Sequence, residues 1–421
     1  MSVSSQRTAE VEVSGPARGR SVAGLALLGV GLLAIAMNLR IGVVSVPPVL
    51  TAIEASLRIS PSVAGLLTTI PVVAYGVFAF CTPRLTRAIG LHRLLGLSVL
   101  LIAVGIALRL QPSLVGLFAG TLIVGAAIAI ANVLMPAAIK QDFSHRVGLM
   151  MALYTTTMSL GAALAAGVTV PLQSGTGGGW RLPLALWATP AVLAFAIWVP
   201  QMLRSPGRNA PGGAAADAPS EAGEPSFRSL LTDPVALAVT AAMGIQGMSY
   251  YAILTWVPSL LRDHGVSAHQ AGWLLAFSNF PSILASLVTP ALARRCRPTW
   301  LPIAVVVALC GLGFLALAVA PVALAYPAMV VLGLGQGAGL TLALCTIVWR
   351  SPDAKHTGHV STMAQGFGYL FGGLGPLAFG LLHTLTGGWN VPLLALGLLL
   401  VVQMIVGVAA SRERYVLESP R

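Results

Sequence analysis

The feature that most constrains this chain is a succession of long apolar segments. A bilayer requires about 20 consecutive apolar residues from each helix that spans it. Only 9% of the 421 residues are charged, whereas a soluble protein carries roughly 25%. Twelve segments have spanning length: 21–46, 61–82, 94–111, 113–138, 148–171, 182–200, 234–257, 269–292, 300–320, 326–349, 359–384 and 391–411. The sequence therefore predicts an all-α integral membrane protein with twelve transmembrane helices embedded in a lipid bilayer.

Basic residues are distributed unevenly over the loops between these segments. With the N-terminus placed in the cytoplasm, 19 of the 24 basic residues fall on that side, and only Arg58, Arg109, Arg181 and Arg262 fall on the other. Cytoplasmic loops of membrane proteins are enriched in Lys and Arg. The pattern predicts that both termini are cytoplasmic. It also explains the basic isoelectric point of 10.4, so we expect no nucleic acid as a partner.

The chain divides into two halves that resemble each other. Residues 201–233 are rich in Pro, Gly, Ala and Ser and cannot bury a core. Ala64-Gly65 and Ala271-Gly272 lie 207 residues apart, as do two Thr-Pro pairs at 82 and 289. We therefore expect a tail at 1–20, a six-helix bundle at 21–200, a linker at 201–233, a second bundle at 234–411 and a tail at 412–421. Two pseudo-symmetric six-helix halves resemble the architecture of the major facilitator superfamily.

Arg40 lies inside an otherwise apolar segment, and in this layout it is the only charge within any spanning core. An Arg at a helix centre costs about 2.5 to 3.5 kcal/mol on insertion scales and normally faces the protein interior or a water-filled cavity. Snorkelling to the headgroups, about 10 Å away, is the alternative. We predict that Arg40 is the positive anchor of a solute site.

Polar side chains in other segments extend this prediction. An offset of 208 residues maps Asn38 onto Gln246, and Gln365 and Tyr369 share one helix face. Hydrogen bonding between helices is the alternative role of each. The predicted substrate-binding set comprises eight residues: Arg40, Asn38, Gln246, Gln365, Tyr369, Asn132, Gln336 and Tyr250.

Charges at the cytoplasmic ends of the segments have a symmetric arrangement. Arg84 and Arg87 follow the second segment and Asp142 follows the fourth; in the other half, Arg294 and Arg295 follow the eighth segment and Asp353 follows the tenth. The symmetry predicts salt bridges that close a cytoplasmic gate and stabilise an outward-open state. Solvated loop charges are the alternative.

Several classes of function find no support in the sequence. No spanning core contains Asp or Glu, so proton coupling has no obvious carrier and anion exchange, cotransport with the solute's own proton and uniport stay open. No Walker spacing occurs, so we expect no ATP hydrolysis. The chain also lacks a catalytic or metal-binding constellation. We therefore expect no enzyme activity, no metal and no cofactor, and we expect a monomer.

Particular segments resemble a smaller family. Met37-Asn38-Leu39-Arg40, NVLMPAAIKQDF from Asn132, and Met363-Ala364-Gln365 followed by HTLTGGW are similar to the cyanate/2-nitroimidazole transporter family of the major facilitator superfamily. The resemblance implies a permease of the bacterial cytoplasmic membrane. We expect a secondary active transporter that moves a small polar or anionic, cyanate-like solute by alternating access. Efflux of nitroimidazole-like compounds is the alternative, and a membrane solute sensor without transport is the candidate from another class.

Overall fold

A computed structural model describes residues 22–175, 177, 179–204 and 227–418. The predicted tail at 1–20, most of the predicted linker and the last three residues of the chain lie outside the described residues. The helices are α1 Val22–Val44, η1 Pro47–Val49, α2 Leu50–Leu57, α3 Pro61–Ala79, α4 Thr82–Ile89, α5 Leu91–Arg109, α6 Leu114–Asp142, η2 Ser144–Arg146, α7 Val147–Gly175, α8 Arg181–Leu186, α9 Ala188–Arg204, α10 Phe227–Leu230, α11 Pro234–Asp263, α12 Ala268–Phe277, α13 Asn279–Arg295, α14 Leu301–Val319, α15 Ala325–Trp349, α16 Ala354–Thr386 and α17 Asn390–Ser411.

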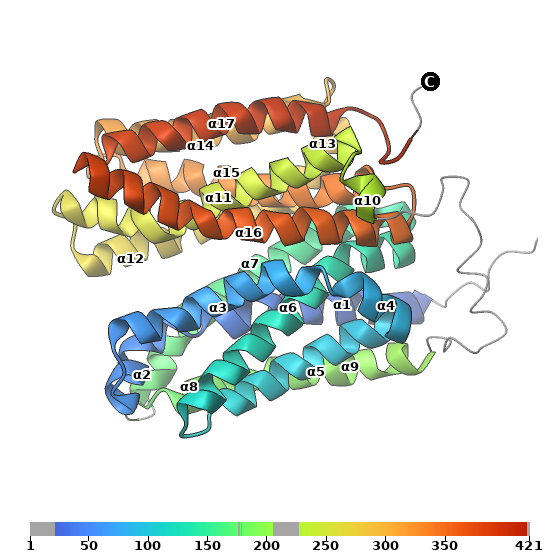
Figure 1. Cartoon of the computed structure of the whole chain (residues 1–421), viewed down its shortest axis with the longest axis horizontal. Helices are drawn as coiled ribbons and strands as arrows, with labels where there is room; N and C mark the ends of the chain where they lie inside the picture. The colour runs from blue at the N-terminus through green and yellow to red at the C-terminus, as the bar shows by residue number, and fades with distance from the viewer. Residues whose placement is uncertain (1–21, 176, 178, 205–226, 419–421) are drawn as a thin grey trace, which may run out of the picture.

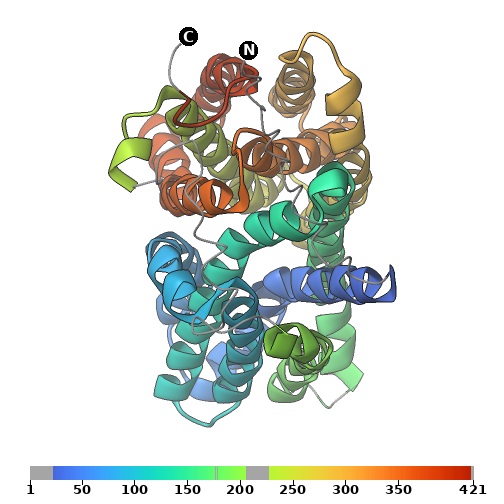
Figure 2. The same cartoon turned by 90° about the vertical axis from the view of Figure 1, so that its right-hand side faces the viewer.

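The helices form two bundles that lie side by side (Figures 1 and 2). The N-terminal half contains α1 to α9, and the C-terminal half contains α10 to α17. The two halves meet along α3 against α16 and along α7 against α13. We call the end where α9 stops and α10 starts the linker end; it lies on the right of Figure 1, and α2, α8 and α12 lie at the opposite end. The described helices therefore have the two-bundle arrangement that the sequence predicts.

Ten helical stretches of the described chain are long and apolar enough to cross a membrane, and the pair α3 and α4 makes an eleventh if it counts as one span. The 33-residue α16 is not among them. Its seven glycines lower its mean hydropathy. The predicted all-helical membrane fold is confirmed, whereas the total of twelve spans is not directly confirmed.

Local sequence explains where several helices begin and bend. The hydroxyls of Ser60 and Ser113 accept hydrogen bonds from backbone N–H groups three residues later, and they cap α3 and α6. In the C-terminal half, Asp233 and Asp353 cap α11 and α16 in the same way. The chain bends by 61° between α3 and α4, where Pro83 occupies the first turn of α4. The predicted loop after the second segment is therefore partly helical.

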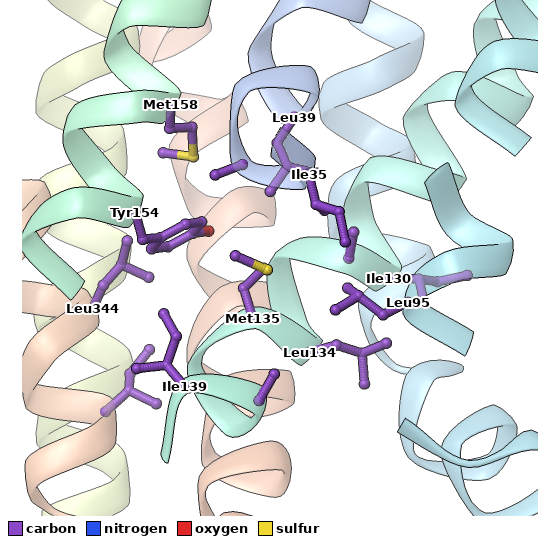
Figure 3. Close-up of a cluster of buried hydrophobic side chains, with 14 of the residues drawn as sticks. Ile35, Leu39, Leu95, Ile130, Leu134, Met135, Ile139, Tyr154, Met158 and Leu344 are labelled. Atoms are coloured by element: carbon purple, nitrogen blue, oxygen red, sulfur yellow. The ribbon is translucent and has the colours of Figure 1, made fainter. Parts of the chain in front are cut away.

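The main hydrophobic core extends from one half into the other. It contains buried residues of α1, α5, α6, α7 and α9 as well as residues of α11, α15 and α16. Figure 3 shows Leu344 of α15 beside Tyr154 of α7 and Ile139 of α6. All three side chains are at most 2% exposed. Continuous packing at this level fixes how the two halves present their polar side chains to one another.

Candidate functional site

Arg40 of α1 lies where the N-terminal half faces the C-terminal half. Its guanidinium carbon lies 5.7 Å from the ring centroid of Tyr250 on α11, a cation–π contact between the halves. The side chain is half-buried. Arg40 makes neither a hydrogen bond nor an ion pair with any residue that the structure describes. A cation with five N–H donors is therefore available to a solute.

Other tyrosines lie near this cation. Tyr75, Tyr251 and Tyr369 lie close enough to Arg40 to interact with its charge, together with Tyr250. The rings of Tyr75 on α3 and Tyr369 on α16 contact each other across the halves, with centroids 5.1 Å apart at 55°. Tyr250 and Tyr369 belong to the set predicted from the sequence, whereas Tyr75 does not. A tyrosine in an apolar helix is the signal that points to Tyr75, but nothing in the sequence shows that α3 approaches α1 and α16.

Gln365 and Tyr369 lie on one face of α16, as predicted from their spacing. The Tyr369 hydroxyl donates to Gln365 Oε1 at 3.5 Å. Gln365 Nε2 in turn donates to the backbone oxygen of Asn132 on α6 at 2.9 Å. The side chain of Asn132 accepts a hydrogen bond from the Tyr154 hydroxyl at 3.3 Å. These residues connect the tyrosine cluster to the contact between α6 and α16, so they hold the two halves together next to Arg40.

Gln246 and Gln336 lie in a different place, inside the C-terminal half. Gln403 Nε2 donates to Gln246 Oε1, Gln246 Nε2 donates to Gln336 Oε1, both at 2.8 Å, and Gln336 Nε2 donates to Ser249 Oγ at 3.0 Å. A Cβ at Gly339 would collide with the Gln246 amide, so glycine is required for this packing. We call Gln403, Gln246, Gln336 and Ser249 the amide chain. Direct solute binding by Gln246 or Gln336 stays a prediction.

Asn38 lies two residues before Arg40 but contacts a different neighbour. Its Nδ2 donates to Pro190 O of α9 at 3.1 Å and to Ala34 O of its own helix at 2.8 Å. The side chain is 1% exposed. The structure therefore places Asn38 inside the N-terminal half, and its predicted role at the solute site is not tested.

Arg109 corrects the expectation that Arg40 is the only charge inside the spanning part of the chain. Arg109 ends α5 and is 1% exposed rather than solvated in a loop. Its Nη1 donates to Gly42 O of α1 at 2.6 Å, and its Nε donates to Thr121 Oγ1 of α6 at 3.1 Å. Gly42 O is available because the chain tightens there, with Val46 N bonded to Val43 O instead. Arg109 lies two residues before the end of the predicted segment 94–111 and is counted with the charges outside the membrane, and only the packing of α1 reveals its burial.

The predicted gate residues lie at the linker end, but their partners differ from those expected. Asp142 pairs with His92 of its own half at 3.6 Å, and Asp353 pairs with His356 of its own half at 2.9 Å. Arg87 Nη2 lies 3.4 Å from Nε2 of His359 across the two halves. Arg84, Arg294 and Arg295 are exposed. A gate at the linker end stays a prediction.

A further contact across the halves at the linker end comes from a residue outside the predicted gate. Lys140 Nζ donates to Val348 O at 3.3 Å. Lys140 ends α6, and Val348 lies in the last turn of α15. At this point the two halves are joined by a lysine that donates to a backbone carbonyl. No group of three His, Cys, Asp or Glu side chains that could hold a metal ion lies in the described ranges.

Known transporters resemble the chain over nearly its whole length. It is 35% identical to an uncharacterized transporter, YycB of Bacillus subtilis (strain 168), over 93% of this chain and 95% of that protein. It is 33% identical to the 2-nitroimidazole transporter of Escherichia coli (strain K12), over 91% and 95% of the two chains. It is 31% identical to the cyanate transport protein CynX of the same strain, over 91% and 97%. The predicted resemblance is therefore confirmed.

Solved structures and a family model agree with these relatives. The proton:xylose symporter XylE bound to 6-bromo-6-deoxy-D-glucose matches with a TM-score of 0.69 and 15% identity, over 92% of this chain and 93% of that one. The fucose:proton symporter FucP of E. coli matches with a TM-score of 0.66 and 14% identity, over 92% and 98%. The Major Facilitator Superfamily model matches residues 26–376 and 242–419. The chain is a multi-pass membrane transporter rather than an enzyme, and it belongs to the major facilitator superfamily.

Proposed function

We propose that this transporter moves a small, flat solute with an anionic group across the bacterial cytoplasmic membrane by alternating access, and that Arg40 binds the anionic group. One observation carries the proposal. Arg40 lies between the halves without a hydrogen-bonding partner among the described residues, while a tyrosine of α11 covers one side of its guanidinium. An intramembrane cation is costly unless it faces a partner or water, so a bound anion is the partner that fits.

The charge at the site favours anions over neutral solutes. No Asp or Glu occurs in any predicted spanning core, so the positive charge of Arg40 has no acidic side chain nearby to neutralise it. Hydrogen bonds between a guanidinium and an anion are short and about twice as strong as neutral ones. A linear or planar anion of the size of cyanate would fit against the fork of the guanidinium. The name of the relative CynX supports a solute of this class.

The tyrosine cluster favours a second candidate, a flat nitro-substituted azole. Tyr250 contacts Arg40, and Tyr75, Tyr251 and Tyr369 lie near it. Aromatic faces stack on planar rings at about 0.5 to 1.5 kcal/mol per pair. The nitro oxygens of such a solute would accept hydrogen bonds from the guanidinium. The relative named as a 2-nitroimidazole transporter supports this alternative. Transport of this solute class would be export.

The contacts between the halves support an orientation and a conformational state. The contacts of Arg87 with His359 and of Lys140 with Val348 lie at the linker end. The linker end also carries most of the basic loops, and an excess of Lys and Arg supports a cytoplasmic position for it. On this assignment both termini are cytoplasmic, and the structure represents a state closed toward the cytoplasm. Opening toward the cytoplasm would require these contacts to break.

The decisive experiment is solute counterflow in proteoliposomes with cyanate, bicarbonate and 2-nitroimidazole, on the wild type and on Arg40→Ala. Loss of a charge-assisted hydrogen bond is expected to lower flux about ten- to hundredfold for the true solute. Arg262→Ala is the matched control, because Arg262 is an exposed arginine at the opposite end and its loss should leave flux unchanged. Retained flux in Arg40→Ala contradicts the assigned site. Binding that protects the protein without any flux would instead favour the sensor.

A further inference from the structure

A large cavity lies at the linker end of the C-terminal half, away from Arg40. Its volume is about 640 Å³, within the range of about 300 to 1,000 Å³ typical of small-molecule sites. Side chains of α11, α13, α14, α15 and α17 form most of its wall. Arg40 and the four tyrosines around it do not line it. Gln246 is the only predicted substrate-binding residue that does. The cavity is therefore distinct from the site proposed for transport.

The inner wall of this cavity offers an unpaired hydrogen-bond acceptor. Gln403 lines the cavity and is 2% exposed. Its Nε2 donates to Gln246 Oε1, and its Oε1 has no hydrogen-bond partner. In the structure the Nε2 of Gln403 is used by Gln246, so Oε1 is the atom of this amide that is left for a ligand. A buried acceptor without a partner costs about 1 to 3 kcal/mol, so Gln403 Oε1 calls for a donor from a ligand.

The mouth of the cavity carries positive charge. Five basic side chains line the cavity against two acidic ones, Glu413 and Glu418. Both acidic groups have neighbours in the protein: Glu413 lies near Arg350, and Glu418 accepts the backbone N–H of Tyr415. Arg294 and Arg297 are exposed and have no hydrogen-bond or ion-pair partner among the described residues. An anionic group is therefore the complement of the mouth.

We propose that this cavity is a second binding site, specific for a small hydroxylated organic anion. Gln403 and Ala410 both line it. They are seven residues apart on α17, with Ala410 nearer the linker end, so the cavity extends about 10 Å along this helix. A bare inorganic anion cannot reach both the cations at the mouth and the acceptor at the inner wall. A glycerol phosphate can, with its phosphate at Arg294 and Arg297 and a hydroxyl donating to Gln403 Oε1.

The position of the site gives its ligand a way to influence the transport cycle. Lys140, Ser144 and Val147 of the N-terminal half also line the cavity. The C-terminal segment 412–418 covers it and is held in place, since Val416 N donates to Arg350 O and Leu417 N donates to Asp233 Oδ2, both at 2.9 Å. A ligand here contacts both halves, so it would stabilise the state closed at the linker end. This conclusion does not depend on which solute Arg40 binds.

The test is calorimetric binding of glycerol 3-phosphate and of inorganic phosphate to the full chain in detergent. Glycerol 3-phosphate is expected to bind more tightly than inorganic phosphate. Arg294→Gln combined with Arg297→Gln should weaken glycerol 3-phosphate about tenfold, because two charge-assisted hydrogen bonds are lost. Arg295→Gln is the matched control, since Arg295 is an exposed neighbour that does not line the cavity. Gln403→Leu should remove the preference for glycerol 3-phosphate over inorganic phosphate.

Nanodiscs distinguish a soluble ligand from a lipid headgroup of the same chemistry. If phosphatidylglycerol supplies the ligand, nanodiscs that contain it will weaken the binding of free glycerol 3-phosphate relative to nanodiscs of phosphatidylcholine. If the ligand is soluble, the two lipids will give equal affinity. The proposal is overturned if neither compound binds, if inorganic phosphate binds as tightly as glycerol 3-phosphate, or if the double variant and Arg295→Gln behave alike. The arginine variants keep the test valid even where Gln403→Leu fails to fold.

Discussion

The two halves of this transporter bury polar groups by opposite means. The N-terminal half contains two arginines inside its spanning part, Arg40 and Arg109, and Arg109 bonds only a carbonyl and a hydroxyl. The C-terminal half contains the amide chain instead, in which neutral groups donate to one another in sequence and leave only Gln403 Oε1 without a partner. An unneutralised charge favours an anionic partner, whereas paired amides favour a rigid scaffold. If Arg40 binds the solute as proposed, the N-terminal half supplies the charge of the site and the amide chain stiffens the C-terminal half.

The two halves also share one polar connection between their first and last long helices. Asn38 and Gln246 occupy matched positions, 208 residues apart, in the first long helix of each half. Asn38 bonds Pro190 of α9, and Gln246 bonds Gln403 of α17. Both amides therefore tie the first long helix of a half to its last helix. The repeat in the sequence corresponds to the same structural connection in both halves, and the halves differ in what lies next to it.

Gln246→Leu is expected to have the largest effect on stability. It would leave Gln403 Nε2 and Gln336 Oε1 buried without their partners. We expect a loss of about 2 kcal/mol in total, at the low end for two unpaired buried groups, because hydrogen bonds between membrane helices contribute little each. Thermal unfolding in detergent measures the loss. Gln403→Leu is the control, since it removes one of these bonds and should cost about half as much. Equal stability of Gln246→Leu and wild type would contradict the role of the amide chain as a frame.

Arg109→Met is expected to do the reverse and impair transport more than stability. Burying an unneutralised guanidinium costs several kcal/mol, and its two hydrogen bonds return about 1.5 to 3 kcal/mol each, so the net change in unfolding free energy should be small. Arg109 holds Gly42, two residues from Arg40. Loss of this support and of a second positive charge should lower anion flux about tenfold. Counterflow and thermal unfolding are measured on the same preparation.

Arg109→Lys separates charge from position. A lysine keeps the positive charge but cannot bond Gly42 O and Thr121 Oγ1 at once, because it lacks the planar fork. Flux close to wild type in Arg109→Lys would assign the effect to charge, and flux as low as in Arg109→Met would assign it to the position of α1. If Arg109→Met transports at the wild-type rate, Arg109 does not contribute to anion transport and the proposed contrast between the halves fails.

The fold was predictable from the sequence, and so was the choice of Arg40 as a candidate residue, for identifiable physical reasons. Apolar length and basic loops predict a helical membrane bundle because the bilayer imposes both. Arg40 is predictable because a charge stands out against apolar neighbours. Tyr75 and Gln403 are not, because a tyrosine or an amide in a spanning helix acquires meaning only from the helix that packs against it. Arg109 shows the same limit, since a charge near the end of an apolar segment reads as an external charge until the fold shows that it is buried.

Tyr75→Leu tests the contact that joins the two halves beside Arg40. The tilted ring pair of Tyr75 and Tyr369 is worth about 1 kcal/mol beyond burial. Its loss should shift the population about fivefold away from the state closed at the linker end. Distances between spin labels at two exposed positions, Arg84 and Arg295, report that shift. Tyr75→Phe keeps the ring and should leave the distance distribution unchanged; a shift in Tyr75→Phe would point to the hydroxyl instead.

The smallest expected effect concerns the helix caps, where the halves again differ. Hydroxyls of Ser60 and Ser113 cap helices of the N-terminal half. In the C-terminal half a hydroxyl caps α12, but carboxylates of Asp233 and Asp353 cap α11 and α16. Burial raises the pKa of Asp353, but the backbone N–H and the imidazole of His356 bond the carboxylate and hold its pKa below the usual value. The ionised carboxylate therefore stabilises α16 at neutral pH.

The sign of the pH effect follows from that lowered pKa. The stabilisation is fully present above the ordinary carboxyl pKa of about 3.9, and it is lost as the pH falls through the lower pKa of the folded state. Asp353→Ala should cost about 1 kcal/mol at neutral pH, and this cost should shrink in acid. Ser113→Ala is the matched control, because a hydroxyl cap is worth a similar amount but does not titrate. Thermal unfolding of both variants from about pH 7 to about pH 3 gives the measurement. If Asp353→Ala costs the same at every pH in this range, the cap does not depend on the charge of the carboxylate. The stability of the caps in both halves would then be independent of pH.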